Sequence, residues 1–160
     1  MLKNYCAKDL QVFPANEKDI PFIKSSYDEN IDALHGEKRS IKKWRELLCE
    51  GQSVYYIVVK DKPLAWFRVD FDGDVLWLGL IVVSKQYQMQ GVGKFVLSQA
   101  ETLAKENDMT KIGVHTTEDN VIAKRLYEKS GFEITEFGDC LTADGTEMQG
   151  YTFIKCMDKN

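Results

Sequence analysis

Three short apolar runs follow one another in the middle of the chain, with turn-forming residues between them. The runs are Ser53–Lys60, Leu64–Phe71 and Val75–Val83, and they are separated by Asp61-Lys62-Pro63 and Asp72-Gly73-Asp74. This pattern predicts three strands of an antiparallel meander. The third run is apolar at consecutive positions, which predicts a central strand that is covered on both faces.

On the N-terminal side of the meander, apolar residues recur at helical spacing. Asn16 is a candidate N-cap for a helix over Glu17–Ser26, and a second helix is predicted over Ser40–Leu48. The polar stretch Tyr27–Arg39 between them is predicted to be a connection.

After the third strand the apolar period changes to that of a helix over residues 92–104, and then back to that of a strand over Lys111–Thr116. A short helix is predicted over Asn120–Ser130, ended by Gly131. Two final strands and the turn that joins them are predicted at Phe132–Phe137, Gln149–Met157 and Asp144-Gly145. This order of elements predicts a mixed α/β sheet in one domain spanning residues 1–160.

Composition narrows the class of protein. The chain has 160 residues, 44% hydrophobic and 29% charged, as expected of an ordinary globular protein. The net charge of −4 argues against a general nucleic-acid surface, which needs clustered Lys and Arg. The N-terminus lacks the apolar run of a signal peptide, and the apolar stretch Leu76–Val83 is too short to cross a bilayer. We therefore expect a cytoplasmic protein without a membrane or nucleic-acid partner.

The cysteines suggest neither a metal site nor a redox motif. They are far apart in the sequence and form no CxxC pair, so they are interpreted as reduced thiols: Cys6, Cys49, Cys140 and Cys156. No metal is expected.

The segment between the third strand and the next helix contains two glycines, Gly91 and Gly93. A glycine turn that opens a helix presents unpaired N–H groups and the positive end of the helix dipole, which together can bind an anion. The alternative is that the glycines only ease the change from strand to helix. Two known phosphate loops do not fit, because the P-loop pattern fails at Gln88 and Phe95 and the dinucleotide pattern fails at Val96.

The turn nevertheless resembles the pyrophosphate motif of the GCN5-related N-acetyltransferases, with Gln88, Gly91 and Gly93 at the expected spacing, although Lys85 stands where proline is usual. A second block is similar to the family's downstream motif, in the same order along the chain: Asn120, Ala123, Leu126-Tyr127-Glu128-Lys129 and Gly131-Phe132. The two motifs cover about residues 76–132.

The resemblance implies a mixed α+β fold, with a central sheet of about six to seven strands flanked by about four helices and splayed between the fourth and fifth strands. It also implies acetyl-CoA as co-substrate, with the pantetheine arm pairing at a bulge around Ile81–Val83. The residues expected to bind the co-substrate are Ile81, Val82, Val83, Gln88, Met89, Gln90, Gly91, Val92, Gly93, Lys94, Asn120, Ala123, Lys124 and Tyr127.

The resemblance assigns the leaving thiolate's proton to Tyr127, although a tyrosine on an amphipathic helix can equally be a packing residue. Asn120 would contact the pantetheine amides, cap its helix, or both. The base is less defined. Histone-acetylating members carry Glu where this chain has Trp77, and members similar to ribosomal-protein acetyltransferases carry Glu where it has His115. His115 is a candidate base, since imidazole titrates near pH 6.5; it can also be a half-exposed strand residue, and many members use ordered water instead.

The implied reaction is transfer of an acetyl group to a primary amine by direct attack in a ternary complex. The acceptor is left open between a small-molecule amine and a peptide amine, and the assembly between a monomer and a homodimer. Side chains expected to contact a cationic acceptor are Tyr27, Asp28, Glu29, Asp70, Asp72 and Glu147. The alternative function is a non-catalytic CoA-binding sensor or interaction module with the same fold.

Overall fold

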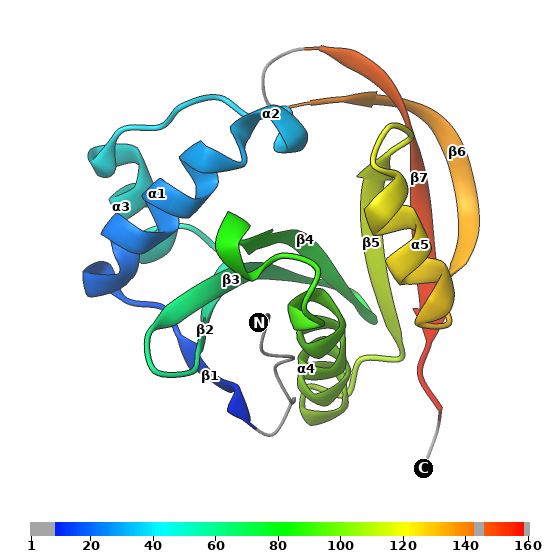
Figure 1. Cartoon of the computed structure of the whole chain (residues 1–160). Helices are drawn as coiled ribbons and strands as arrows, with labels where there is room; N and C mark the ends of the chain where they lie inside the picture. The colour runs from blue at the N-terminus through cyan, green and yellow to red at the C-terminus, as the bar shows by residue number, and fades with distance from the viewer. Residues whose placement is uncertain (1–8, 143–145, 159–160) are drawn as a thin grey trace.

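The structure is a computed structural model that describes residues 9–142 and 146–158. Seven strands form one sheet in the order β1-β2-β3-β4-β5-β7-β6 (Figure 1). The strands are β1 (Gln11–Pro14), β2 (Val54–Val59), β3 (Pro63–Asp72), β4 (Val75–Val83), β5 (Lys111–Thr117), β6 (Glu133–Leu141) and β7 (Glu147–Cys156). The helices are α1 (Ile20–Glu29), α2 (Ile31–Leu34), α3 (Ile41–Cys49), α4 (Val92–Glu106) and α5 (Val121–Lys129), with short 3-10 turns η2 (Glu17–Asp19) and η3 (Lys85–Tyr87).

The sheet is mixed because β4 and β5 are parallel, while the other neighbouring strands pair antiparallel. Two parallel neighbours require a long crossover, and α4 supplies it. The predicted mixed α+β fold of six to seven strands is therefore confirmed.

Helices cover both faces of the sheet. Leu76 and Leu78 of β4 belong to the larger core cluster together with Val96 of α4 and Tyr127 of α5. The smaller cluster lies on the other face, where Trp66 of β3 packs with residues of α1 and α3. The apolar character of β4 on both faces follows from this two-sided burial, as the sequence pattern predicted.

Three elements differ from the sequence-based prediction. β1 was not predicted, because a strand of four residues at a sheet edge is too short to show an alternating apolar pattern. It forms by pairing with β2, which lies far along the chain. The stretch predicted as a polar connection contains the end of α1 and the four-residue helix α2, which ends at His35 in a left-handed conformation. β6 continues beyond the predicted end at Phe137 to Leu141. The predicted turn at Asp144-Gly145 lies outside the described residues.

β4 and β5 separate along part of their length. They pair from Val75 opposite Lys111 to Leu78 opposite Val114. Beyond this point, among the described residues, β4 pairs only with β3 and β5 only with β7. The expected splay is therefore present (Figure 1). The β-bulge lies at Gly79, where the β3–β4 register shifts, and not at Ile81–Val83 as predicted; the Arg68 side chain lies against Gly79.

Candidate active site

The turn that opens α4 lies at the end of β4. Gln88 Nε2 donates to the carbonyl oxygen of Val83 at 3.0 Å and to Asn30 Oδ1 at 2.8 Å. Asn30 Nδ2 also donates to the Val83 carbonyl, at 3.1 Å. These bonds tie the turn to β4 and to the end of α1, and they occupy the Val83 carbonyl with two donors.

Gly91 is the N-cap residue of α4 and has a φ of +85°. A side chain on an L-residue rarely adopts this conformation, so the turn requires glycine here. Among the described residues other than Gly91 and its two chain neighbours, no atom lies within 4 Å of the position that a Cβ would take, so the space in front of the backbone is open. The first N–H groups of a helix lack intrahelical acceptors. The turn therefore has the room, the donors and the dipole for a phosphate group.

Gly93 has a different role. A Cβ at this position would lie 3.0 Å from Leu126 Cδ2, so the absence of a side chain lets the start of α4 approach α5 closely. This contact brings the two predicted motifs together, since Leu126 stands next to Tyr127 in the sequence. The neighbouring Met89 side chain is 82% exposed.

Tyr127 of α5 is only 7% exposed and lies among aromatic rings, with its ring centroid 5.4 Å from that of Phe153 and 5.9 Å from that of Phe132. Burial raises the pKa of Tyr127 to about 12. Within the described part of the chain its hydroxyl makes no hydrogen bond. The side chain is thus a protonated phenol at neutral pH and has a free donor.

Asn120 is the N-cap of α5, and its Oδ1 accepts from the Ala123 N–H at 3.1 Å. It also lines the cavity described next. Lys124, one turn along α5, lies with Nζ 4.8 Å from the centre of the Tyr151 ring and 3.9 Å from Glu128 Oε1.

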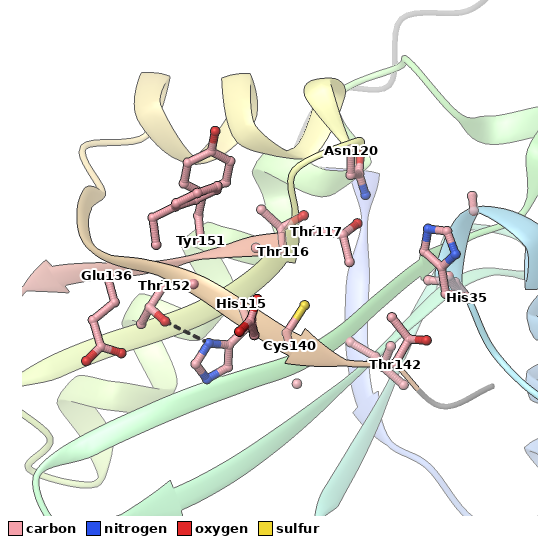
Figure 2. A pocket seen from close by; sticks show the side chains of 18 residues that line it. His35, His115, Thr116, Thr117, Asn120, Glu136, Cys140, Thr142, Tyr151 and Thr152 are labelled. Atoms are coloured by element: carbon pink, nitrogen blue, oxygen red, sulfur yellow. Dashed lines mark hydrogen bonds between the residues drawn. The ribbon is translucent and has the colours of Figure 1, made fainter. Parts of the chain in front are cut away.

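A cavity of about 860 Å³ lies beside the opening between β4 and β5 (Figure 2). His115 lines it from β5, on the opposite face from Ile112 and Val114, which pack in the core under α4 and α5. Within the described residues the lining holds the carboxylates Glu136 and Asp139 and no lysine or arginine. Most of the lining residues come from α2, from the splayed ends of β4 and β5, and from the β6–β7 hairpin.

Two contacts hold the His115 ring. Its Nδ1 lies 3.1 Å from Thr152 Oγ1 on β7, the residue directly opposite in the sheet (Figure 2). Its ring stacks on the Trp77 indole, with centroids 4.7 Å apart and the planes 5° from parallel. The two residues that occupy the alternative base positions of the family motif are thus in direct contact.

A further contact, between His35 and Asp119, lies beside the opening between β4 and β5. His35 Nε2 of α2 lies 3.0 Å from Asp119 Oδ2 in the loop between β5 and α5, so it connects the two halves of the splayed sheet. The Thr117 hydroxyl, and secondarily His35, lower the pKa of Asp119. No motif in the sequence marks His35, because its role depends on where α2 ends.

The six side chains proposed from sequence for acceptor binding do not line this cavity. Tyr27 is buried beside Trp44 and Trp66, Asp28 pairs with Lys24, and Glu29 accepts from the Lys85 N–H. Asp70 accepts from Ser53 and pairs with Arg68, while Asp72 and Glu147 are exposed at strand ends.

The cavity instead takes its side chains from the last hairpin, including Glu136, Phe137, Tyr151 and Thr152. Sequence reasoning missed these residues, since strand alternation alone does not say which face of a hairpin a cavity will occupy.

Over the described ranges, no helix is long and apolar enough to span a bilayer. The same residues contain no group of three or more His, Cys, Asp or Glu side chains placed to hold a metal ion.

The fold and the α4 turn define a class of acetyltransferase-like proteins, and comparison with known proteins identifies the family. Residues 20–132 match the acetyltransferase (GNAT) family. The chain therefore belongs to this family.

One curated relative is GCN5-related N-acetyltransferase 7, chloroplastic, of Arabidopsis thaliana, 40% identical over 57 residues; the match covers 36% of this chain and about a fifth (21%) of that protein. A crystal structure provisionally named as a phosphinothricin N-acetyltransferase superposes with a TM-score of 0.80 at 16% identity, covering 94% of this chain and 99% of that one. YncA of Salmonella typhimurium, provisionally named an acetyltransferase and solved with its cofactor acetyl-CoA, has a TM-score of 0.75 at 14% identity, with coverage of 95% and 96%. At these identities the structural matches support the fold.

Proposed function

We propose that the protein transfers an acetyl group from acetyl-CoA to a primary amine, by direct attack within a ternary complex. The observation that carries this proposal is the position of the opening between β4 and β5. The α4 turn lies at one end of it, and the cavity that contains His115 lies beside it. A donor held by the turn and an amine held in the cavity would therefore meet at the opening.

On the donor side, the N–H groups from Gln88 to Lys94 are proposed to bind the pyrophosphate, because Gly91 leaves open space in front of them. The backbone of Ile81, Val82 and Val83 is proposed to contact the pantetheine arm, with an N–H near Val82 or Val83 stabilising the oxyanion. The Val83 carbonyl already accepts two side-chain amides, so the arm must use the other polar groups of this segment. Asn120, Ala123 and Lys124 complete the proposed donor site.

The proton transfers can be assigned to two side chains. His115 accepts a proton from the substrate ammonium, which leaves the amine nitrogen free to attack the thioester carbonyl carbon. The C–N bond forms and the C–S bond breaks. Tyr127 hydrogen-bonds the departing thiolate and gives it a proton, and the second proton lost by the nitrogen restores Tyr127 through water. The reaction as a whole releases one proton to solvent, from His115.

The raised pKa of Tyr127 bears on this role. A phenol with a pKa of about 12 is a weaker acid than an ordinary thiol, which titrates near 8.5. Proton transfer from Tyr127 to the sulfur is therefore unfavourable by itself, even after the C–S bond has broken. We propose that Tyr127 hydrogen-bonds the thiolate as it leaves and gives up its proton only as the second proton of the nitrogen reaches it through water.

The acceptor is proposed to be a small-molecule or peptide amine that carries positive charge. The cavity offers Glu136 and Asp139 as counter-charges and Phe137 and Tyr151 as aromatic surfaces. Its volume of about 860 Å³ accommodates a small molecule or the end of a peptide.

Two measurements test the proposal. Acetyl-CoA at saturating concentration should raise the melting temperature, since a ligand that binds only the folded state stabilises it. A panel of small amines and peptide N-termini should then show free-thiol release with acetyl-CoA, and mass spectrometry should show the product heavier by one acetyl group. No thermal shift would contradict donor binding. A shift without thiol release across the panel would favour the sensor or interaction module instead.

A further inference from the structure

The imidazole of His115 is held by residues from three strands, although it is an exposed side chain. Trp77 stands opposite Gly113 in the parallel pairing of β4 with β5. The indole lies directly over Gly113, and the space that a Cβ at Gly113 would need is taken by the indole ring. From there the indole reaches the face of the His115 ring two residues along β5. Gly113 therefore admits the indole, and the indole supports the imidazole.

Thr152 fixes the rotation of the same ring. It is the residue opposite His115 in the β5–β7 pairing, and its Oγ1 lies 3.1 Å from Nδ1. A stack on one ring face and a hydrogen bond at one ring edge leave a single orientation for the imidazole. In that orientation the second nitrogen, Nε2, points away from Thr152 (Figure 2), and the residue lines the cavity.

We propose that Trp77, Gly113 and Thr152 are positioning residues that hold His115 as a base, with Nδ1–H donating to Thr152 Oγ1 and the lone pair of Nε2 facing the acceptor. The tautomer matters, because a neutral imidazole has one donor and one acceptor nitrogen. Only the form protonated at Nδ1 can take the ammonium proton at Nε2. The catalytic part of this inference rests on the proposed function, whereas the ring orientation and tautomer do not.

The charged surroundings are compatible with this role. The titratable side chains that share the cavity with His115 come from α2 and the β6–β7 hairpin, and they are His35, Glu136, Asp139, Cys140 and Tyr151. Behind the stack, Asp70 of β3 stands opposite Trp77 and is paired with Arg68. The lining of described residues holds no lysine or arginine that would oppose an approaching ammonium group.

NMR spectroscopy tests the geometry without any turnover, because the chain has only two histidines. His35→Gln assigns the signals. When the His115 imidazole of the wild-type protein is neutral, its ¹⁵N chemical shifts should be those of the Nδ1-protonated tautomer. Its ring protons should be shifted upfield by the indole. Trp77→Leu should remove the upfield shift, and Thr152→Val should change the tautomer balance, with His35 unaffected in both. An Nε2-protonated wild-type ring, or a His115 spectrum unchanged by Trp77→Leu, would overturn the proposal.

Kinetics test the catalytic consequence. Thr152→Val is nearly isosteric and should lower kcat/KM for the amine roughly tenfold, because misorientation of a base is costly. Thr152→Ser should recover most of the loss, and the KM for acetyl-CoA should not change. In a plot of kcat/KM against pH, the decrease on the acid side should become smaller in Trp77→Leu. It should remain in Trp77→Phe, which keeps an aromatic ring.

The two proposals can fail separately. If the wild-type protein releases no thiol with any amine, the proposed function fails while the NMR result still stands. If the wild-type protein is active and Thr152→Val is equally active, the positioning role fails and the acetyltransferase function stands.

Discussion

The α4 turn and the cavity lie at the same opening in the sheet but are built differently. The turn presents backbone groups, and its key residues are two glycines, which have no side chain. Gly91 can therefore adopt a φ of +85°, and Gly93 allows the close approach of α5. The cavity presents side chains from α2, β5 and the β6–β7 hairpin. A site made of backbone groups tolerates few sequences, whereas the side chains of a cavity can be replaced one at a time. The family motifs therefore include the α4 turn, and they specify little of the cavity lining.

The largest effect that would sharpen this comparison is expected at Tyr127 of α5, next to Leu126, the residue against which the start of α4 packs. Tyr127→Phe keeps the ring and removes only the hydroxyl, so turnover should fall about a hundredfold, as is typical for loss of a proton donor. Acetyl-CoA affinity should stay unchanged. Tyr56→Phe, a change of the same size remote from the opening, serves as the control. Equal turnover in Tyr127→Phe and the wild-type protein would remove Tyr127 from the mechanism.

The same hydroxyl should affect stability in alkali. Because burial raises the pKa of Tyr127 from 10.0 to about 12, the folded state holds this proton more strongly than the unfolded state does. The stabilisation is complete below pH 10 and is lost as pH rises towards 12, by about 3 kcal/mol in the free energy of unfolding. Denaturant titrations from pH 9 to 12 should show a steeper decline for the wild-type protein than for Tyr127→Phe. Parallel curves would mean that the hydroxyl reaches solvent.

Gly91→Val tests whether the donor region depends on backbone conformation. A β-branched residue at positive φ costs about 1–3 kcal/mol, and the turn would have to distort to relieve it. Acetyl-CoA affinity, measured by calorimetry, should fall about tenfold. Gly73→Val is the matched control, since Gly73 also has a positive φ and open space but lies in the β3–β4 turn. It should lose stability and keep donor affinity; a similar loss of affinity in both variants would point to general destabilisation.

The smallest effect is expected in the cavity. Phe137 is half exposed, and its ring centroid lies 4.9 Å from that of Tyr151. Phe137→Ala removes one aromatic surface, so the KM for the amine should rise about threefold. The KM for acetyl-CoA should remain constant. A change in donor KM would show that the two regions are not separable.

The sequence predicted most of the fold, because the period of apolar residues reports which positions are buried. The meander, the α4 crossover and the final hairpin all followed from it. β1 and α2 did not, since each has only four residues, and β1 owes its conformation to pairing with the distant β2. The bulge at Gly79 was missed for a similar reason, since its place is set by pairing with β3.

For the site, resemblance to the family motifs marked the residues of the turn, together with Asn120, Tyr127 and His115, as candidates, because the spacing of these motifs can be read along the chain. The acceptor residues were chosen by charge, and the structure placed Tyr27 in the core and the rest outside the cavity. The cavity lining comes from segments between residues 33 and 152, and only folding brings them together.

What the sequence determined by itself was the glycine turn between β4 and α4, because a turn between a strand and a helix is a local structure. The tertiary structure decided which side chains face the opening. Trp77 and His115 are 38 positions apart, and their stack exists only because β4 and β5 pair in parallel with Gly113 opposite Trp77. Strand register, which is set by packing of the whole sheet, thus determines the environment of the proposed base.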